Sequence, residues 1–358
     1  MFTLPRSSAF LVGALFTAVA VAPTRAQTER RTLTGTRVAI YNLAGKLKLQ
    51  PGSGSAVVVD ITRGGRDGNQ LSFSSGDIHG ASALRVLYPA DRIVYPDMGY
   101  RSRTDIRVNE DGTFDDDYDN GRDWWGRRDR VEVRGSGSGL EAYADLLVSV
   151  PRGQQISIHL GVGEATVSNV DGNISVKVSS ARIVSEHTRG YLNLDTGSGS
   201  VSVTDANGDV NLDTGSGSVT VDGVVGQDLR MDTGSGSLTA ANIDVKTLKA
   251  DVGSGGIRLS RIKASRVNLD AGSGGIDVDL LSVVDELTVD TGSGGATIRL
   301  PAAQGADVDI ETGSGGIQSD FPVTTSRFGQ HTLRGKIGDG RARIRIEAGS
   351  GSVRLLKN

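Results

Sequence analysis

Acidic residues beside a repeated glycine phrase are the first candidates for chemistry in this sequence. The phrase Asp-Thr-Gly-Ser, which matches the catalytic phrase of aspartic proteases, begins at Asp195, Asp213, Asp232 and Asp290. A protease of that class needs two carboxylates that share one proton between two lobes. Here the phrase returns at a regular interval and varies, as in Asp251-Val-Gly-Ser. A shared requirement for turn geometry explains all copies, so we do not expect protease activity.

In a stack of repeats these acids would form one column. Its members would be Asp195, Asp213, Asp232, Asp251, Asp270, Asp290 and Glu311. Like charges that lie directly opposite one another destabilise a sheet, so the column needs relief. Exposure to solvent, and hydrogen bonds from Thr hydroxyls and turn amides, are the simplest relief. Calcium between the coils is the alternative, although the spacing of calcium-binding β-helix repeats is absent. No other cofactor is expected.

A second acidic group lies in a charged segment, residues 96–130. Asp115, Asp117 and Asp119 begin like a calcium-binding loop. Position twelve of that loop is Gly126, where a bidentate glutamate is needed. The sequence therefore argues against an EF-hand and leaves a looser cation site at these three acids as a hypothesis.

The same segment contains the only two tryptophans, Trp124 and Trp125. Adjacent indoles could anchor the segment on the rest of the protein, or could present an aromatic platform to a glycan or a protein. Arg127 and Arg128 follow directly and would add charge to that platform. We predict that a specific binding site, if the protein has one, includes these four residues.

Other residue types exclude several kinds of site. The chain has no cysteine, which rules out a thiol nucleophile, thiolate zinc sites and disulfides. His79, His159, His187 and His331 are scattered without metal-ligand spacing. Neither a nucleophile elbow in a strand-to-helix context nor a Walker phrase occurs. We therefore expect a protein that is not an enzyme.

The elements that position these groups follow from the glycine phrase itself. Gly-Ser-Gly-Ser or Gly-Ser-Gly-Gly begins at Gly197, Gly215, Gly234, Gly253, Gly272, Gly292, Gly313 and Gly349. The first seven copies are 18 to 21 residues apart, and the last gap is 36, about two periods. Apolar and polar residues alternate on both sides of the phrase, as in a strand with one buried face. The glycines would supply positive φ and close backbone approach at a sharp corner.

A period near 19 is explained most simply by one coil per repeat, stacked about 4.8 Å apart. The predicted fold class is all-β: a single-stranded, right-handed β-helix or β-solenoid of about 19–20 residues per coil, with an irregular N-terminal portion. A hairpin array or a repetitive sandwich is the alternative, but hairpins would leave open edges. Aromatic residues make up only 4% of the chain, so Val, Ile, Leu and Ala must fill the core.

Four segments are expected along the chain. Residues 1–26 have the pattern of an export signal, with Arg6 followed by an apolar run too short to span a membrane. Residues 27–35 would be a flexible N-terminus, 36–150 an irregular β region with the charged loop at 96–130, and 151–358 the solenoid. The arginines of 342–347 and 353–356 are expected to guard the C-terminal edge.

Three phrases carry a resemblance to a known family: Val38–Gly45, Ala144–Gly153 and Leu160–Gly172, together with the Asp-Thr-Gly-Ser-Gly repeats. The sequence resembles the "putative adhesin" family of bacterial exported proteins with glycine-rich β-strand repeats, a domain of unknown function. The resemblance covers most of residues 36–358, but not the charged segment. It implies binding at the cell surface or in the envelope and brings no catalytic residues.

We expect a non-enzymatic exported protein of the periplasm, cell surface or medium that acts as an adhesin or a structural solenoid. Its partner would be a surface glycan or an envelope protein. Without Arg6 and Arg25 of the signal, 37 bases face 42 acids, which gives no basic footprint for nucleic acid. No membrane span is expected after cleavage of the signal.

Three other functions remain as alternatives. A carbohydrate-active β-helix enzyme, either a lyase or a hydrolase, would need the charged segment to wall its cleft. A self-associating periplasmic scaffold would stack coil ends across chains. An ice-binding face would use the aligned Thr196, Thr214, Thr233, Thr291 and Thr312.

Overall fold

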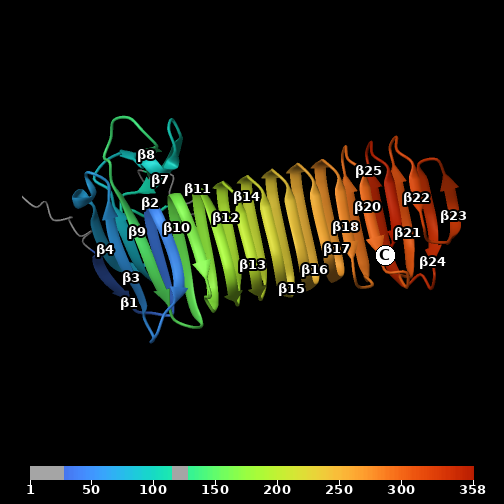
Figure 1. The fold of residues 1–358 in the computed structure, drawn as a ribbon, viewed down its shortest axis with the longest axis horizontal. Coiled ribbons are helices and arrows are strands. Elements are labelled where there is room, and N and C mark those ends of the chain that lie inside the picture. Colours follow the sequence, from blue (N-terminus) through green and yellow to red (C-terminus); the bar gives the residue numbers. More distant parts are fainter. Residues whose placement is uncertain (1–27, 115–127) are drawn as a thin grey trace, which may run out of the picture.

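The protein is an elongated stack of β-coils with an irregular module at its N-terminal end (Figure 1). The computed structural model describes residues 28–114 and 128–358. Strands make up 71% of the described residues, which contain no α-helix. Two single 3-10 turns, η1 (Gly68–Gln70) and η2 (Pro96–Met98), are the helical elements that they include. The predicted all-β solenoid class is confirmed, whereas its right hand stays a prediction.

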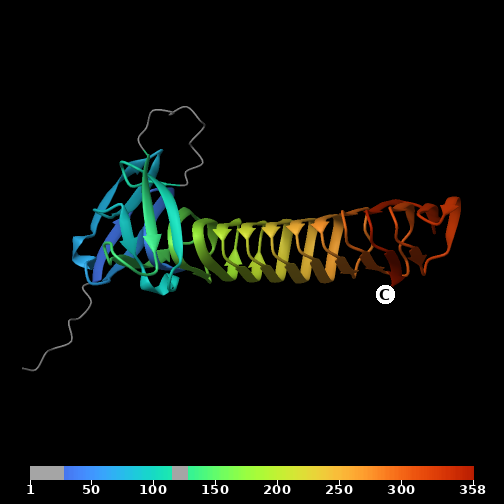
Figure 2. The same cartoon turned by 90° about the horizontal axis from the view of Figure 1, so that it is seen from above.

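Each coil contributes one strand to each of two facing parallel sheets. For example, β12 (Leu192–Ser198) belongs to what we call the first sheet, and β13 (Val201–Asn207) to the second sheet. The next coils repeat this arrangement in β14 (Val210–Ser216), β15 (Val219–Ser235), β16 (Leu238–Ser254), β17 (Ile257–Ser273), β18 (Ile276–Leu280), β19 (Glu286–Thr291) and β20 (Ala296–Leu300). Paired residues lie 18 apart between β12 and β14, 19 between β15 and β16, and 20 between β17 and β19. Figure 2 shows how narrow the resulting stack is.

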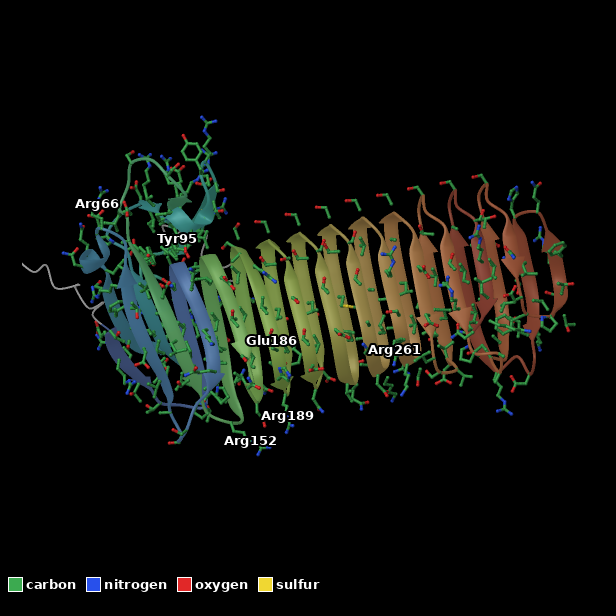
Figure 3. All side chains as sticks on the ribbon, in the orientation of Figure 1. Arg66, Tyr95, Arg152, Glu186, Arg189 and Arg261 are labelled. Carbon is green, nitrogen blue, oxygen red and sulfur yellow. The ribbon has the colours of Figure 1, made fainter. Side chains whose placement is uncertain are left out.

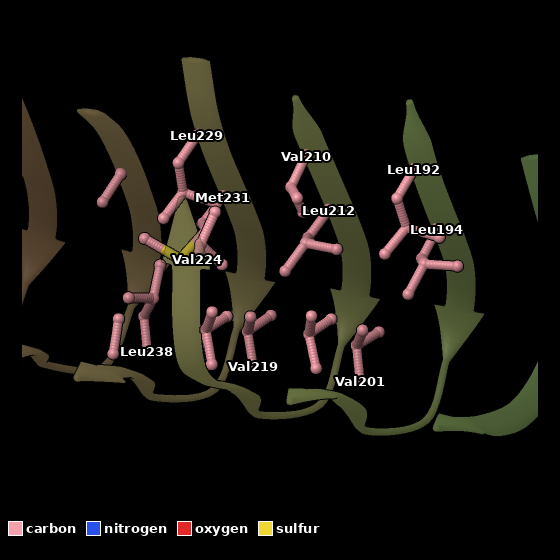
Figure 4. Close-up of a cluster of buried hydrophobic side chains, with 14 of the residues drawn as sticks. Leu192, Leu194, Val201, Val210, Leu212, Val219, Val224, Leu229, Met231 and Leu238 are labelled. Atoms are coloured by element: carbon pink, nitrogen blue, oxygen red, sulfur yellow. The ribbon is translucent and has the colours of Figure 1, made fainter. Parts of the chain in front are cut away.

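The core is the space between the two sheets. Inward residues of the first sheet, such as Leu194 and Leu212, face inward residues of the second sheet, such as Val201 and Val219 (Figure 4). The same apolar positions recur in every coil, so one continuous cluster runs from Leu33 to Leu355. Because aliphatic side chains fill this thin space, the low aromatic content agrees with the observed packing.

The glycine phrase forms the corner between the first and the second sheet, which we call the glycine corner. Positive φ occurs at its second glycine, for example 144° at Gly217 and at Gly236. The prediction that the glycines of the phrase supply positive φ is therefore confirmed for the second glycine in the coils from Gly199 to Gly274. The first glycines are needed for close approach, since a Cβ at Gly234 would lie 2.6 Å from the carbonyl oxygen of Gly215. The same approach recurs at Gly197, Gly215, Gly253, Gly272, Gly292, Gly313 and Gly349.

Threonines line the inside of the glycine corner. Four of them, Thr196, Thr214, Thr233 and Thr291, have no exposed surface. Thr214 Oγ1 donates a hydrogen bond to the carbonyl oxygen of Gly199 at 3.1 Å, and Thr233 Oγ1 donates to that of Gly217 at 3.0 Å. The hydroxyls thus satisfy backbone carbonyls of the preceding coil. The ice-binding alternative is wrong, because this column, including the nearly buried Thr312, does not face solvent.

A second corner returns the chain from the second sheet to the first sheet. It uses residues in the left-handed conformation that no repeated phrase marks in the sequence. Positive φ occurs at Asn169, His187, Asp205, Gly223, Asn242 and Arg261, one per coil. Asn, Asp and His tolerate this conformation better than most non-glycine residues. The second corner therefore has no repeated sequence phrase that would mark it.

The C-terminal coil lies between two coils that precede it in sequence. After β20 the chain forms β21 (Ala306–Thr312) and β22 (Ile317–Ser319), then β23 (Val323–Gly329) and β24 (Thr332–Ile337), and ends in β25 (Ala342–Ala348) and β26 (Val353–Lys357). In the first sheet β25 pairs with β19 on one side and with β21 on the other. In the second sheet β26 lies in the same way between β20 and β22. The hairpin of β23 and β24, which lies between β22 and β25 in sequence, explains the gap of 36 residues before the last glycine phrase.

The expectation that 342–347 and 353–356 guard the C-terminal edge is therefore wrong, because both segments are interior strands of the stack. The edge of the first sheet is an antiparallel hairpin instead, in which β24 pairs with β21 and β23 pairs with β24. The outer strand has a register irregularity between Thr325 and Arg327. A bulge and a charged side chain on an edge strand discourage pairing with another chain, although Phe328 there is 75% exposed.

The N-terminal part begins with a full coil of the same stack. The long strand β2 (Arg37–Pro51) pairs along both halves with β10 (Gln154–Ser168), which pairs with β11 (Gly172–Arg189). The predicted boundary at 150/151 is therefore not a boundary of the stack. Beyond β2, the first sheet continues through β5 (Ala81–Leu87) and β4 (Ser72–Ile78). The second sheet continues through β9 (Tyr143–Val150), β3 (Val57–Gly64) and β1 (Thr28–Leu33).

Residues 28–33 are ordered as β1, so the prediction of a flexible segment at 27–35 is wrong for this part. Leu33 is 2% exposed in the core, and the Arg30 Nε lies 2.6 Å from Asp60 of β3. The charged segment is also more regular than expected. It contains β7 (Arg103–Asn109), which pairs with β8 (Arg128–Arg134), and β8 pairs in turn with β6 (Arg92–Val94). These strands form a separate three-stranded sheet. Its apolar residues, such as Ile106, are buried on one face, which explains why the segment is ordered as strands.

Substitution of the second glycine of a phrase should test the glycine corner. We expect Gly236→Ala to destabilise the protein by about 1–3 kcal/mol through its backbone conformation alone. The new Cβ would also lie 2.0 Å from the carbonyl oxygen of Gly217. Thermal unfolding followed by circular dichroism measures the loss. Gly316→Ala is the matched control, since no atom lies within 4 Å of that Cβ, and an equal loss in both variants would contradict this account.

Candidate functional site

Most of the predicted binding site lies outside the described residues. This applies to Trp124, Trp125 and Arg127, and to the proposed cation ligands Asp115, Asp117 and Asp119. Arg128 is the first residue of β8, and its backbone pairs with that of Asn109 in β7. The described residues therefore define only the base on which the predicted platform would stand.

That base is an aromatic cluster on the outer face of the first sheet. β7 contributes Ile106 and the segment after it contributes Phe114, and both belong to one buried cluster with Tyr41 of β2. The Tyr41 ring stacks on the His159 ring at 4.4 Å, and Phe114 meets Tyr41 edge-on at 6.0 Å. Tyr95 joins the same cluster and is almost fully buried. These described aromatic residues hold the module in place, which is the role that one hypothesis gave to the tryptophans.

A buried polar network fixes the same region to the stack. The Tyr88 hydroxyl donates a hydrogen bond to Asn42 Oδ1 at 2.7 Å, and Asn42 Nδ2 donates to the carbonyl oxygen of Ala144 at 2.8 Å. Burial raises the pKa of Tyr88 above its ordinary value. Because its hydroxyl stays protonated and paired at all physiological pH values, the network is a fixed structural support.

Arginines gather around one glutamate on the three-stranded sheet. The Glu132 carboxylate lies 2.6 Å from Arg134 Nη2, 3.3 Å from Arg92 Nε and 3.8 Å from Arg103 Nε. The hydrogen bond from Arg134 is the main cause that lowers the pKa of Glu132. Three cations around one anion leave local positive charge on the three-stranded sheet.

The acidic column exists, and it is longer than predicted. In register along the first sheet it contains Asp195, Asp213, Asp232, Asp251, Asp270, Asp290, Glu347 and Glu311. The prediction that Glu311 follows Asp290 directly is wrong, because the inserted β25 places Glu347 between them. Toward the N-terminal end the column continues as Lys177 and His159. We call the eight acids the carboxylate column.

Mutual repulsion within the carboxylate column is only partly relieved. Burial and then the charges of Asp251 and Asp213 raise the pKa of Asp232. Burial and then the charges of Asp251 and Asp290 raise the pKa of Asp270. Arg230 Nη2 lies 3.7 Å from Asp232, which is one source of relief.

Nearby bases also pair with the acids at the C-terminal end of the column, where Arg345 contacts Glu347 and Arg334 contacts Glu311. The expected relief from the phrase threonines does not occur in the two coils described above, because Thr214 and Thr233 donate to backbone carbonyls instead. Solvent and neighbouring basic side chains therefore offset the repulsion between the carboxylates of the column.

No group of three or more acids or histidines within residues 28–114 and 128–358 could hold a metal ion. Neighbours in the column meet only along one line, so each carboxylate has at most two acidic neighbours in register. Calcium between coils stays a hypothesis. The four histidines also remain apart: His187 Nε2 lies 3.3 Å from Asp205 at the second corner, and His331 Nδ1 lies 3.0 Å from the carbonyl oxygen of Gly315.

The family model described as Toastrack DUF4097 matches residues 134–356, more than half of the chain. The chain belongs to this family. The Toastrack match begins at the last residue of β8 and ends within β26, so it includes every coil that carries the carboxylate column. Residues before 134, including most of the three-stranded sheet, lie outside it.

Two further comparisons add little to the Toastrack assignment. A solved structure described as a putative cell adhesion protein from Clostridium sporogenes ATCC 15579 shares 10% sequence identity. The similarity covers 93% of this chain and 100% of that chain with a TM-score of 0.23, a level that carries no argument. No curated protein matches the sequence.

The stability of the protein should report on the carboxylate column. Asp232 and Asp270 have raised pKa values in the folded state, so the folded protein binds protons more tightly than the unfolded chain does. The free energy of unfolding therefore increases as the pH falls through these raised pKa values toward the ordinary value of 3.8. We expect the double variant Asp232→Asn, Asp270→Asn to be more stable than the parent at pH 7, by about 0.2–1 kcal/mol per opposed pair. This gain should shrink as the pH falls to 4.5.

Thermal unfolding of parent and variant at pH 7 and pH 4.5 measures this difference. Asp279→Asn is the control, since Asp279 lies in the second sheet opposite Arg299 and has no acid partner in that register. A double variant less stable than the parent at pH 7 would show that the column is not repulsive.

Proposed function

We infer that this Toastrack protein is a non-enzymatic binding or structural protein of the cell envelope. One observation carries the proposal: eight carboxylates recur in register along one rigid outer face instead of converging in a cleft. A repeated array presents the same group many times at a fixed interval. Such an array favours attachment to an extended or repetitive partner, because several weak contacts act together.

The charge of the outer face indicates the chemistry of the partner. Three bases, Arg230, Lys249 and Arg345, occupy the positions two residues before the acids, against eight carboxylates in the column. An acidic face attracts cationic groups and repels anionic ones, and salt screens both effects. The proposed partner is therefore an envelope protein with a basic segment or a surface glycan with amino groups.

A second contact in the proposal is the predicted platform of Trp124, Trp125, Arg127 and Arg128. Support comes from the described strands: β7 and β8 are held on the stack by buried aromatic residues, and Glu132 of β8 collects three arginines. A rigid base under an aromatic and basic segment suits recognition of a glycan or a protein. The double variant Trp124→Ala, Trp125→Ala tests this part alone.

Binding to polycations tests the acidic face. We expect the full chain to bind immobilised polylysine and chitosan at low ionic strength, and to be released by salt. Replacement of Asp213, Asp232, Asp251 and Asp270 by Asn should weaken binding at least tenfold, since four charges leave one face. Surface plasmon resonance measures the affinity.

A control with the same change in net charge separates the face from overall charge. It replaces Asp222, Asp244, Asp277 and Asp279, none of which belongs to the carboxylate column, by Asn. Equal weakening in both quadruple variants would contradict a role for the carboxylate column. Unchanged binding in the column variant would also contradict it.

Export is part of the proposal and rests on the pattern of residues 1–26. No helix among the described residues is long and apolar enough to cross a membrane. We expect the chain in the envelope or the medium of intact cells, and digestion by added protease if it reaches the surface. Fractionation with a cytosolic marker measures this, and retention with the marker would contradict export.

A further inference from the structure

A groove along the second corner has no role in the function proposed above. It crosses four successive coils and encloses about 660 Å³. One wall is formed by the positive-φ residues, among them His187 and Asp205, and the other by residues two positions later, such as Arg189 and Asn207. Figure 3 shows Arg189 on the long edge of the stack where this corner lies.

The floor of the groove contains a buried hydroxyl group without a hydrogen-bond partner. Thr188 is 3% exposed and lines the groove, and its Oγ1 has no partner among the described residues. The positions that follow it in register are apolar: Ala206, Val224 and Ile243. An unpaired buried hydroxyl costs about 1–3 kcal/mol, and native proteins pair nearly all such groups. Thr188 is thus a polar residue followed in register by apolar residues. Its unpaired hydroxyl points to a hydrogen-bonding group that enters from the groove.

The walls offer donors and acceptors in near balance. Arg189 only donates, Asp205 only accepts when ionised, and the Asn207 amide does both. His187 Nε2 lies 3.3 Å from Asp205 Oδ2 along the first wall. The Asp205 carboxylate on this wall and the Arg189 guanidinium on the other give the groove charges of both signs. This set favours neither a strong anion nor a strong cation. It suits hydroxyl groups, each of which donates and accepts.

The far end of the groove is apolar. Gly223 leaves the first wall without a side chain there, and Val225 on the second wall is 55% exposed. A sugar ring has a C–H face and a hydroxyl rim, which match an apolar patch beside polar walls. Four coils about 4.8 Å apart span roughly 14 Å from first to last, so the occupant must be extended along the stack.

We propose that this groove binds a short, neutral oligosaccharide whose chain runs along the stack axis. Asp205, Asn207 and Arg189 bond its hydroxyl groups from the walls, and Thr188 Oγ1 bonds one hydroxyl, or the water that bridges to it, from the floor. The exposed Val225 packs against a ring face. The site is separate from the carboxylate column and does not depend on it.

Calorimetric titration of the full chain with cellohexaose, chitohexaose and xylohexaose tests the proposal. At least one should bind, and Asp205→Asn should weaken that binding at least tenfold, since a charged hydrogen-bond acceptor is lost. Asp244→Asn is the matched control. Asp244 is exposed and occupies the register position that follows Val225, just beyond the groove, so its variant should bind as the parent does.

The floor has its own matched pair. Thr188→Val keeps the shape of the side chain and removes the hydroxyl, so it should weaken binding about 2- to 10-fold. Ser185→Val is the control, because Ser185 lies in the same coil, is fully buried and also has an unpaired hydroxyl, but does not line the groove. It should leave the affinity unchanged. Thermal unfolding of each variant separates loss of binding from loss of fold.

Three outcomes would overturn the proposal: no binding of any of the three sugars, full binding by Asp205→Asn, or equal losses in the groove variants and their controls. Binding of extended peptides in the groove without binding of sugars would show that the saccharide assignment is wrong. None of these outcomes affects the polycation test of the acidic face, so failure of one proposal is distinguishable from failure of the other.

Discussion

The in-register stacking of parallel strands is the constraint on which the rest of this structure depends. Once coil follows coil at about 4.8 Å, every residue meets its counterpart in the next coil. Inward positions must then be aliphatic in all coils, and backbone must pass close to backbone at the glycine corner, as it does from Gly215 to Gly234. Outward positions repeat as well, which turns a single acid per coil into the carboxylate column. The column is thus a consequence of the stacking. Burial and the neighbouring acids disfavour the charged form of its carboxylates, as the raised pKa of Asp232 indicates.

The sequence alone was sufficient to predict the features that arise from the same residue types recurring in each coil. The period, the alternation and the glycine phrase predict the stack of β-coils and most of the carboxylate column. Features that depend on which coils are neighbours were not predictable, because chain order and stacking order differ at the C-terminal end. For that reason Glu347 was missed, and the strand Ala342–Ala348 was assigned to an edge although it is interior.

The second corner shows a different limit. Its residues share a backbone conformation rather than a residue type, so Asn169, His187, Asp205 and Arg261 form no visible motif. The groove beside them was consequently missed, whereas the buried hydroxyl of Thr188 could have been noticed as one polar residue in an apolar column. The phrase threonines were misread in the opposite sense, since their regular spacing indicated an outer face and they point inward to backbone carbonyls.

The inserted coil also determines how this protein would bear a mechanical load. In an ordinary solenoid a pull on the last coil peels it from a single neighbour, one hydrogen bond at a time. Here β25 pairs with β19 on one side and β21 on the other, and β26 pairs in the same way with β20 and β22. A pull on Leu355 must break its pairing with β20 and with β22 at once. In the first sheet the outer neighbour β21 is itself backed by the hairpin of β23 and β24. A force applied to the C-terminal coil is therefore shared between its two neighbouring coils.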